Sequence, residues 1–457
     1  MPKGTRKVAF SFDERQITHF GGMWLIQRFC NKLRLRYLLH RYVRTFQRRA
    51  EYDPAELLLA LMFAIIMGLR RINKTEILQY NGAFLEMLGL RRFPDQTTLR
   101  RFLKRLPPQT IRRLVRLHDS LRAYLFPLPT TRTTLVFDLD SVVVVIYGHQ
   151  EGARIGYNPK KHGRRSYHPL LCFEAHFQEF WHGRLRPGNA ASSTGAVPFL
   201  RICLAKVPPT IARSRIRFRM DAGFYGNRVM RFLDESRCGY VIVVPEYPHL
   251  RAQAQSCRFH RLANGWEAGV FRAQVHHKWK RRHRFVVIRR PLPTDPTEAE
   301  QRTFFKDTRY GYHLFVTNLT LSPWRVYLFY RPRAAVEKNI RELLYDYPLG
   351  KIPTDSWTAN VAFFHLLLFA ANLVHWFKRL CLPAAYRTAT LDTIRTDFLV
   401  LPARLVRVHK QKVVKLPYDY HYRHEFQAAV QRIRQLRLPK SFRFCQEARQ
   451  ASRRDTG

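Results

Sequence analysis

The first third of the chain carries the apolar spacing of helices. Pro54 to Arg70 has the apolar density of a core helix, and Pro54 suits a first turn. Asn73 to Leu90 predicts a further helix, and Asp95 or Thr97 could cap a short one after it. We therefore expect an all-α domain over residues 1–130. Either it is a helix-turn-helix that docks on DNA or it is an ordinary bundle with a basic surface. The short helix would present Arg100, Arg101, Lys104 and Arg105.

From about residue 134 the pattern becomes that of strands. Thr134 to Tyr147 is β-branched and apolar but is interrupted by two aspartates. The further expected elements are strands at His168 to Phe177 and Phe180 to Leu185, a helix at Gly195 to Lys206, a strand at Ile216 to Met220, a helix at Asn227 to Arg237 and a strand at Tyr240 to Pro245. This order is expected of an α/β fold with a ribonuclease-H-like, retroviral-integrase-like mixed sheet flanked by helices.

The alternation stops at about residue 246. Trp266 to His276, His283 to Arg290 and Tyr312 to Leu319 indicate strands, which predicts a β-rich insertion at about 246–326. Helices are expected at Pro332 to Tyr345 and near 357–380. The predicted catalytic domain thus covers residues 131–382. A basic C-terminal region, 383–457, follows, with expected elements in a hairpin at Leu405 to Leu416 and a helix near His424 to Leu436.

Val361 to Phe377 is apolar enough to raise the question of a membrane span. It contains His365, Asn372 and His375, which are costly at the centre of a bilayer, and the run is short. We therefore expect a buried core helix and no membrane partner. The seven cysteines are odd in number and form no Cys-x-x-Cys pair, and the first residues lack an apolar signal stretch. These features favour a reducing cytoplasm.

The net charge of the chain is the strongest indication of its binding partner. The chain has 80 Lys and Arg against 33 Asp and Glu, a formal net charge of +47 spread along its whole length. So many like charges repel each other and oppose a compact state, whereas a polyanion relieves that repulsion and releases its own counterions. Nucleic acid is the partner that such a balance indicates.

Four carboxylates stand out in a chain with few acids. Asp138 and Asp140 lie in the apolar strand two positions apart, so they face the same way. Asp221 ends the strand before Ala222-Gly223, where α/β sheets place their chemistry, and Glu337 lies on a predicted helix. Clustered carboxylates are the ligands that Mg²⁺ needs for phosphodiester chemistry. Structural roles stay open as alternatives: a pair with a buried arginine for the first two, a helix cap for Asp221, and ion pairs along the helix for Glu337.

Several segments together carry a resemblance. They are Asp138 to Ser141, Tyr147 to Pro159, Gly163 to Leu170, Arg219 to Tyr225, and finally Tyr330, Arg333 and Glu337 at the spacing of a tyrosine-arginine-glutamate signature. The chain thereby resembles bacterial insertion-sequence DDE transposases of the thirteen-eighty family, within the insertion-sequence-four-like group. The motifs run from about residue 134 to 345.

This resemblance implies that Asp140, Asp221 and Glu337 form a metal-binding triad for two Mg²⁺ ions, which Mn²⁺ could replace. Asp138 is the rival for the first position; Asp140 is preferred because it precedes Ser141, as in the group's motif. Tyr330 and Arg333 would contact phosphate near the cut. The signature of the group ends in a lysine where this chain has Leu344, and nearby Arg341 could supply the charge instead.

Two basic segments are candidate DNA contacts. The first is the loop from Gly148 to His168, and the second is a cationic cluster with an aromatic ring in the insertion, which could hold phosphates and stack on an unpaired base. A solvated basic loop is the alternative for the first. The candidate residues are Arg154, Lys160, Lys161, Arg164 and Arg165 in the loop, and Trp279, Lys280 and Arg281 in the cluster. No cysteine or carboxylate is spaced to complete a zinc site among the nearby histidines.

The function implied by the resemblance is cut-and-paste transposition of an insertion sequence. The expected partners are double-stranded DNA, as terminal inverted repeats and target, and a second copy of the chain, because two element ends are paired. A non-catalytic DNA-binding protein derived from such an enzyme, and a structure-specific nuclease, are the two alternatives.

Overall fold

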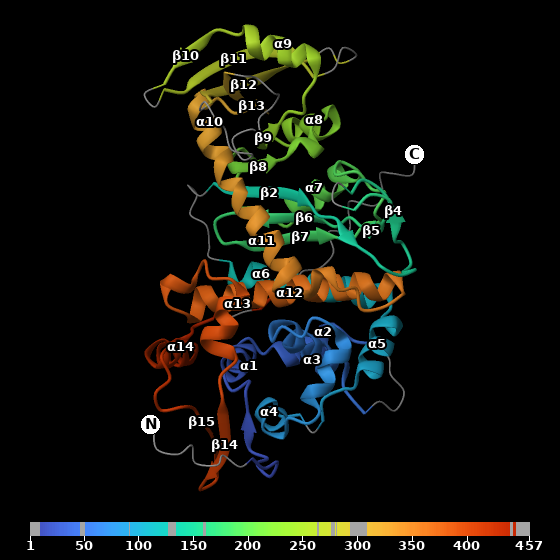
Figure 1. The fold of residues 1–457 in the computed structure, drawn as a ribbon, viewed down its shortest axis with the longest axis vertical. Helices are drawn as coiled ribbons and strands as arrows, with labels where there is room; N and C mark the ends of the chain where they lie inside the picture. The colour runs from blue at the N-terminus through green and yellow to red at the C-terminus, as the bar shows by residue number, and fades with distance from the viewer. Residues whose placement is uncertain are drawn as a thin grey trace, which may run out of the picture. The chain divides into compact units, whose positions relative to one another are not determined.

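The computed structural model describes residues 10–45, 51–90, 92–126, 134–158, 161–262, 265–275, 279, 281–292, 309–438 and 442–444. The chain divides into two compact units (Figure 1). One is formed by residues 126–341. The other is formed from both ends of the chain, by residues up to 125 and from 342 onward.

The unit of residues 126–341 is built on a nine-stranded sheet among the residues that the structure describes. Its first part holds β2 (Leu135–Ser141), β6 (Leu170–Glu174), β7 (Glu179–Arg184), α7 (Ala196–Ala205), β8 (Ile216–Met220), α8 (Asn227–Glu235) and β9 (Gly239–Val243). The expected order of three strands, helix, strand, helix, strand is therefore confirmed. β2 pairs parallel with β8 and antiparallel with β6, and β8 pairs parallel with β9.

The segment predicted as a β-rich insertion, at about 246–326, extends this same sheet. Its strands are β10 (Phe259–Arg261), β11 (Glu267–Gln274), β12 (Arg282–Pro291) and β13 (Tyr310–Thr317), preceded by α9 (Pro248–Ser256). The full strand order is β10-β11-β12-β13-β9-β8-β2-β6-β7. Because β13 pairs antiparallel with β9, the backbone groups at that edge are satisfied by the later strands. The strands expected in this segment are present, and they continue the sheet of the predicted catalytic domain.

The alternation of β2 decides which residues enter the core. Leu135, Phe137 and Leu139 join a buried cluster with residues of α7, β8 and α8. Asp138 and Asp140 therefore lie on the opposite face. Two helices cross that face, α10 (Pro323–Tyr330) and α11 (Ala334–Tyr345), the second belonging to this unit up to Arg341 (Figure 1).

The other unit is mainly helical. Its elements before residue 126 are α1 (Met23–Lys32), α2 (Leu35–Tyr42), α3 (Pro54–Ile66), the 3₁₀ turn η1 (Ile72–Leu78), α4 (Gly82–Leu88), α5 (Gln96–Arg105) and α6 (Pro108–Leu125). Those after residue 342 are α12 (Trp357–Cys381), α13 (Leu391–Ile394), the π turn η7 (Arg395–Leu399), β14 (Ala403–Val408), β15 (Gln411–Lys415) and α14 (Arg423–Gln435).

Two expectations for the N-terminal region need correction. The helix expected at Asn73 to Leu90 is split into η1 and α4, because the Asn81 side chain accepts a hydrogen bond from Phe84 N at 3.1 Å and starts a new helix there. The region is also not all-α: β1 (Ile17–Thr18) pairs with β14 from the far end of the chain. The short helix α5 is present, and Asp95 caps it through Thr98 N at 2.8 Å.

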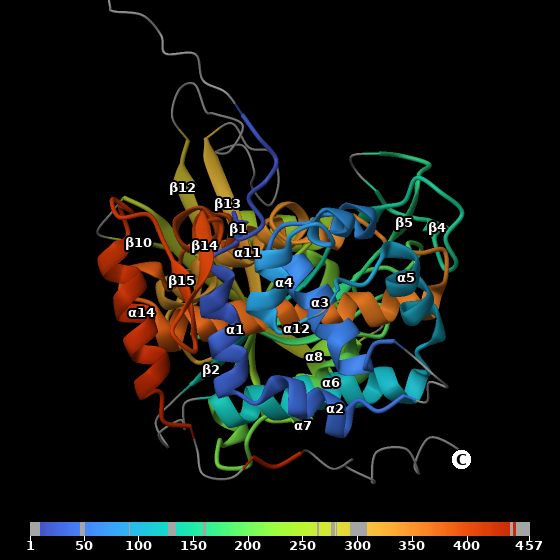
Figure 2. The same ribbon diagram turned by 90° about the horizontal axis from the view of Figure 1, so that it is seen from below.

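Helix α12 forms the centre of this unit. It packs against α3, α5, α6 and α14 (Figure 2). By length and composition alone it could cross a membrane, but most of its apolar stretch is buried, as in the core helix of a globular protein. Its polar residues have partners there: Asn372 Nδ2 lies 2.7 Å from His118 Nε2 on α6. Residues 342–382 thus group with the two chain ends, which differs from the three-part division expected from the sequence.

Candidate active site

Two aspartates meet at the carboxyl ends of the parallel strands β2 and β8. Leu139 and Met220 are register partners, so the next residues, Asp140 and Asp221, leave the sheet side by side. β2 and β8 are far apart in the sequence. Their parallel pairing places their carboxyl ends at one edge of the sheet.

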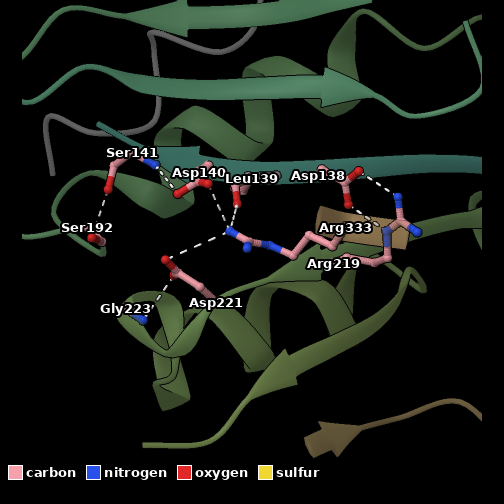
Figure 3. A network of polar contacts seen from close by, with 9 residues as sticks. All are labelled: Asp138, Leu139, Asp140, Ser141, Ser192, Arg219, Asp221, Gly223 and Arg333. Atoms are coloured by element: carbon pink, nitrogen blue, oxygen red, sulfur yellow. Dashed lines mark hydrogen bonds and ion pairs between the residues drawn. The ribbon is translucent and has the colours of Figure 1, made fainter. Parts of the chain in front are cut away.

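Arg333 lies between the two aspartates. Its Nη2 is 3.2 Å from Asp140 Oδ2 and 3.8 Å from Asp221 Oδ2, and it donates a hydrogen bond to Leu139 O at 3.2 Å. Figure 3 shows the three side chains pointing toward one another. Only 6% of the Arg333 surface is exposed, so these contacts are made with little competition from water.

Each aspartate holds its second oxygen in place with a backbone amide. Asp140 Oδ1 accepts from Ser141 N at 2.7 Å, and Asp221 Oδ1 accepts from Gly223 N at 3.0 Å (Figure 3). The latter bond caps the 3₁₀ turn η3 (Ala222–Phe224), so the capping role considered for Asp221 is real. It occupies one oxygen and leaves Oδ2 directed at the site.

Burial and mutual repulsion disfavour the charged forms of this pair. Burial raises the pKa of Asp140 to about 6; Arg333 opposes that rise, and the charges of Asp221 and Glu337 add to it. The pKa of Asp221 is raised as well, by burial first and by Glu337 in addition, with Arg333 lowering it. Two carboxylates with raised pKa values, held at one point, favour a cation between them.

Asp138, the rival for the first position, is fully engaged elsewhere. Its two oxygens accept from Arg219 Nε and Nη2, both at 2.6 Å, and both side chains are buried (Figure 3). Arg219 also donates to Phe329 O at 3.0 Å. This is the buried arginine pair that the sequence left open for Asp138 or Asp140, and it makes Asp138 the less suited of the two as a metal ligand.

Glu337 lies on α11, one turn beyond Arg333, and its side chain is exposed. Its charge reaches both aspartates, since it raises the pKa of each. Yet within the described residues no three His, Cys, Asp or Glu side chains gather closely enough to hold a metal ion. The structure therefore brings together Asp140 and Asp221 and leaves Glu337, the third expected acid, exposed on α11.

The other signature residues lie around this pair. Tyr330 is the last residue of α10 and packs against Phe315, with ring centroids 4.9 Å apart. Burial raises its pKa to about 12. Arg341 is exposed on α11, one turn after Glu337. The charges of Arg333, Asp221 and Asp140 also act on that pKa, so Tyr330 lies near the aspartate pair.

The expected DNA contacts separate into two groups. Arg154, Lys161, Arg164 and Arg165 are all exposed on or beside a small three-stranded sheet, whereas Lys160 lies outside the described residues. In the later segment, Trp279 packs against the core of the large sheet, which makes it a poor stacking surface. Arg281 forms an ion pair with Asp234 at 3.1 Å, and Lys280 is not among the described residues.

Sequence reasoning assigned no role to Arg219 or Ser192. Arg219 is the register partner of Asp138, and a cation in a buried strand opposite an aspartate is a signal that strand pairing could have revealed. Ser192 Oγ lies 2.9 Å from Ser141 Oγ, and it comes from a loop with no pattern of its own.

A family of known proteins matches almost the whole chain. The family described as Transposase DDE domain group 1 matches residues 1–438. The chain belongs to the DDE transposase family. No curated protein matches the sequence of this transposase.

Among solved structures, a piggyBac transposase synaptic complex with hairpin DNA, determined by cryo-electron microscopy, is similar at 11% identity and a TM-score of 0.41. The similarity covers 90% of this chain and 91% of that one.

Proposed function

We propose that this chain is a cut-and-paste DNA transposase with a ribonuclease-H-like catalytic core. It cleaves DNA at the ends of a mobile element and joins the freed 3′ ends to target DNA. One observation carries the proposal: Asp140 and Asp221 meet at the ends of adjacent parallel strands, with their free oxygens on one guanidinium. Membership of the DDE transposase family supports it.

The donor set fits magnesium in its chemistry. Asp140 and Asp221 each direct one hard oxygen, Oδ2, at Arg333 rather than at a backbone amide, and Glu337 on the facing helix would complete the set for two Mg²⁺ ions or for Mn²⁺. When bound, such ions make a water or 3′-hydroxyl nucleophilic and stabilise the departing oxygen. Glu337 must turn inward to join the aspartates, because its side chain is exposed.

Arg333 has two tasks in this proposal. Without metal it balances the two carboxylates, which hold it in place and keep its own pKa raised despite burial. With metal and DNA present its fork of N–H donors contacts phosphate oxygens near the cut, and Tyr330 lines the same space. Its buried Nε makes no hydrogen bond within the protein, which leaves a donor for that purpose.

DNA is the partner that the charge supports. The net charge of +47 matches a long polyanion, here the terminal inverted repeats and the target. Pairing of two element ends requires two copies of the chain, so we propose a homodimer on DNA. The motifs favour a bacterial insertion sequence of the thirteen-eighty family as the mobile element that encodes this transposase. We propose that the enzyme acts in the cytoplasm.

The test is cleavage of the native element ends by Asp221→Asn in Mg²⁺. Asn keeps an oxygen that can accept from Gly223 N, so the turn is preserved while the charge is lost. We expect cleavage to fall at least about a thousandfold, the scale of electrostatic catalysis by metals and dipoles, with DNA affinity within about twofold. Asp419→Ala, at an exposed carboxylate of the other unit, is the control and should cleave normally.

Cleavage retained by Asp221→Asn would remove the assignment. A wild-type chain that binds the ends tightly but never cuts them would favour the non-catalytic alternative. The observation that favours this alternative is that no three-acid group is present among the described residues.

A further inference from the structure

A small sheet leaves the large sheet at the proposed catalytic site. It consists of β3 (Val144–Val145), β5 (Arg165–Tyr167) and β4 (Arg154–Ile155), in that order, and with its loops we call it the finger (residues 144–158 and 161–167). β2 ends at Ser141, so the finger begins three residues later, and it returns to the large sheet at β6. In Figure 1, β4 and β5 lie beyond the carboxyl end of β2.

The base of the finger is held rigidly from inside. Buried Arg186 donates to His168 O at 2.9 Å and to Thr194 O at 2.7 Å, and Tyr167 donates to Glu151 O at 2.5 Å. The backbones of the finger and of Gly188 also approach closely, since a Cβ on Gly188 would lie 2.3 Å from Arg154 O. The base of the finger is therefore held by buried side chains and by backbone contacts.

Those exposed side chains are of two kinds. The apolar ones are Tyr147, Ile155 and Tyr157, exposed by 73%, 60% and 77%. Around them the cationic Arg154, Lys161, Arg164 and Arg165 are also exposed. Glu151 is the one acid between residues 144 and 167. A surface that combines aromatic rings with cations is suited to a ligand that has both flat faces and negative charge.

Lys161 shows how the two kinds are combined. It donates to Tyr147 Oη at 2.5 Å, and its Nζ lies 5.1 Å from the centroid of that ring. A base stacked on Tyr147 would thus have a cation beside it for its own phosphate. Duplex DNA offers phosphates to such a surface but keeps its base faces covered, whereas unpaired bases expose them.

We propose that the finger holds unpaired nucleotides of the DNA strand next to the cut, stacked on Tyr147 and Tyr157. The proposal rests on the proposed function, because the finger is attached beside Asp140. Its cations contact phosphates and fix position, and its rings select strands that are opened there. The finger thereby favours DNA that is melted at the element end over a continuous duplex.

The experiment measures DNA binding by the full chain in EDTA, so that no cleavage intervenes. Two oligonucleotides share one sequence; one is fully paired, and the other has a short unpaired patch containing 2-aminopurine. We expect the wild type to bind the patched DNA at least about tenfold more tightly and to change the 2-aminopurine fluorescence, given the usual cost of losing one stacked base.

The variants separate stacking from charge. Tyr147→Ala/Tyr157→Ala should lose the preference for patched DNA and the fluorescence change, while Tyr147→Phe/Tyr157→Phe keeps both. Tyr80→Ala, at a tyrosine that is 89% exposed in the other unit, is the matched control and should behave as wild type.

Three results would overturn the proposal: equal affinity of the wild type for both DNAs, an unchanged preference in the double alanine variant, or loss of the preference in the phenylalanine variant. Because the assay contains no metal, each result is independent of cleavage. A chain that prefers patched DNA yet does not cut would contradict the proposed function alone.

Discussion

Two aspartates on one face of a single strand meet different arginines. Asp138 is locked by two short hydrogen bonds from Arg219, and Asp140 shares Arg333 with Asp221. The first pair satisfies both oxygens, whereas the second leaves two negative groups on one positive group. Charge is thus balanced at Asp138 and left in excess at Asp140, which is the condition for taking up a cation.

This excess has a consequence for stability in the absence of metal. Burial raises the pKa of Asp140 to about 6, and an aspartate in an unfolded chain titrates near about 3.9. The folded state therefore binds the proton more tightly. The stability gained by protonation is complete below about pH 4 and is lost as the pH rises through about 6.

We accordingly expect the free energy of unfolding of the wild type, relative to Asp140→Asn, to decrease by on the order of 2 kcal/mol between about pH 4 and about pH 7. Urea denaturation of both proteins in EDTA measures it. The neutral amide of Asn cannot titrate, so the difference between the two curves isolates Asp140 and the groups it interacts with. A difference that stays constant over this range would contradict the expectation.

At this scale the strand pattern indicates candidates, and the preference for Asp140 over Asp138 rests on the resemblance and not on the pattern. The strand pattern placed Asp138 and Asp140 on one face, and the turn after β8 marked Asp221. The choice depends on which arginine each carboxylate meets, and that is decided by pairing between β2 and β8 and by the path of α10 and α11. Neither is a local property of the sequence.

Elements fixed by local pattern were predicted best. β8 was expected at Ile216 to Met220 and lies there, and the apolar helix near 357–380 is α12. Elements that depend on distant partners were missed. β1 has two residues and exists because β14 pairs with it, and β10 pairs only with β11 in the strand order of its sheet. Short segments like these carry too few residues to show a period.

The end of α3 offers a prediction about such distant partners. Arg395, in the π turn η7, donates to Ile66 O at 2.6 Å and to Ile65 O at 3.0 Å, and also to Asp346 O at 2.7 Å. It thereby satisfies Ile66 O at the last turn of the helix and adds a second donor to Ile65 O, which also accepts from Gly68 N at 3.1 Å. Gly68, at φ +86°, lets the guanidinium approach, since a Cβ there would lie 3.0 Å from Arg395 Cζ.

Arg395→Met should therefore lower the free energy of unfolding by about 3 kcal/mol, because buried carbonyls lose charged donors. Arg387→Met, at an exposed arginine nearby, should change it by less than about 0.5 kcal/mol. Denaturant unfolding of both variants gives the comparison. Equal stability of the two would show that water satisfies the end of α3 instead.

At the scale of the whole molecule, charge is the property that the sequence revealed most directly. The whole chain has a net charge of +47, and the excess of Lys and Arg extends over both units and is not gathered in a tail. Binding that neutralises many phosphates releases as many counterions, so affinity must fall steeply with salt.

We expect affinity for DNA to fall roughly a thousandfold or more between about 50 and 200 mM salt, as for six or more phosphate contacts. In Arg154→Gln/Arg164→Gln/Arg165→Gln the slope of log affinity against log salt should become shallower by about 2 to 3. Fluorescence anisotropy over a salt series measures both slopes. An unchanged slope would place these arginines away from the DNA backbone.

The division of the chain into two units could not be predicted from the sequence. Linear order suggested three successive domains, and the apolar helix seemed to close the second. Its polar residues were the available hint, because His118 on α6 is the partner of Asn372. A contact between residues so far apart in the chain cannot be read from composition or spacing.

The late position of α12 in the sequence determines when its unit can be completed during synthesis. Synthesis runs from the N-terminus, so α3, α5 and α6 leave the ribosome before residues 126–341, and α12 emerges only after all of them. Until then the apolar sides of the early helices lack the element that covers them. A message cut short before codon 357 would yield a protein that contains Asp140 and Asp221 but leaves the apolar sides of α3, α5 and α6 without α12 to cover them. We expect chaperones or proteases to remove such a product.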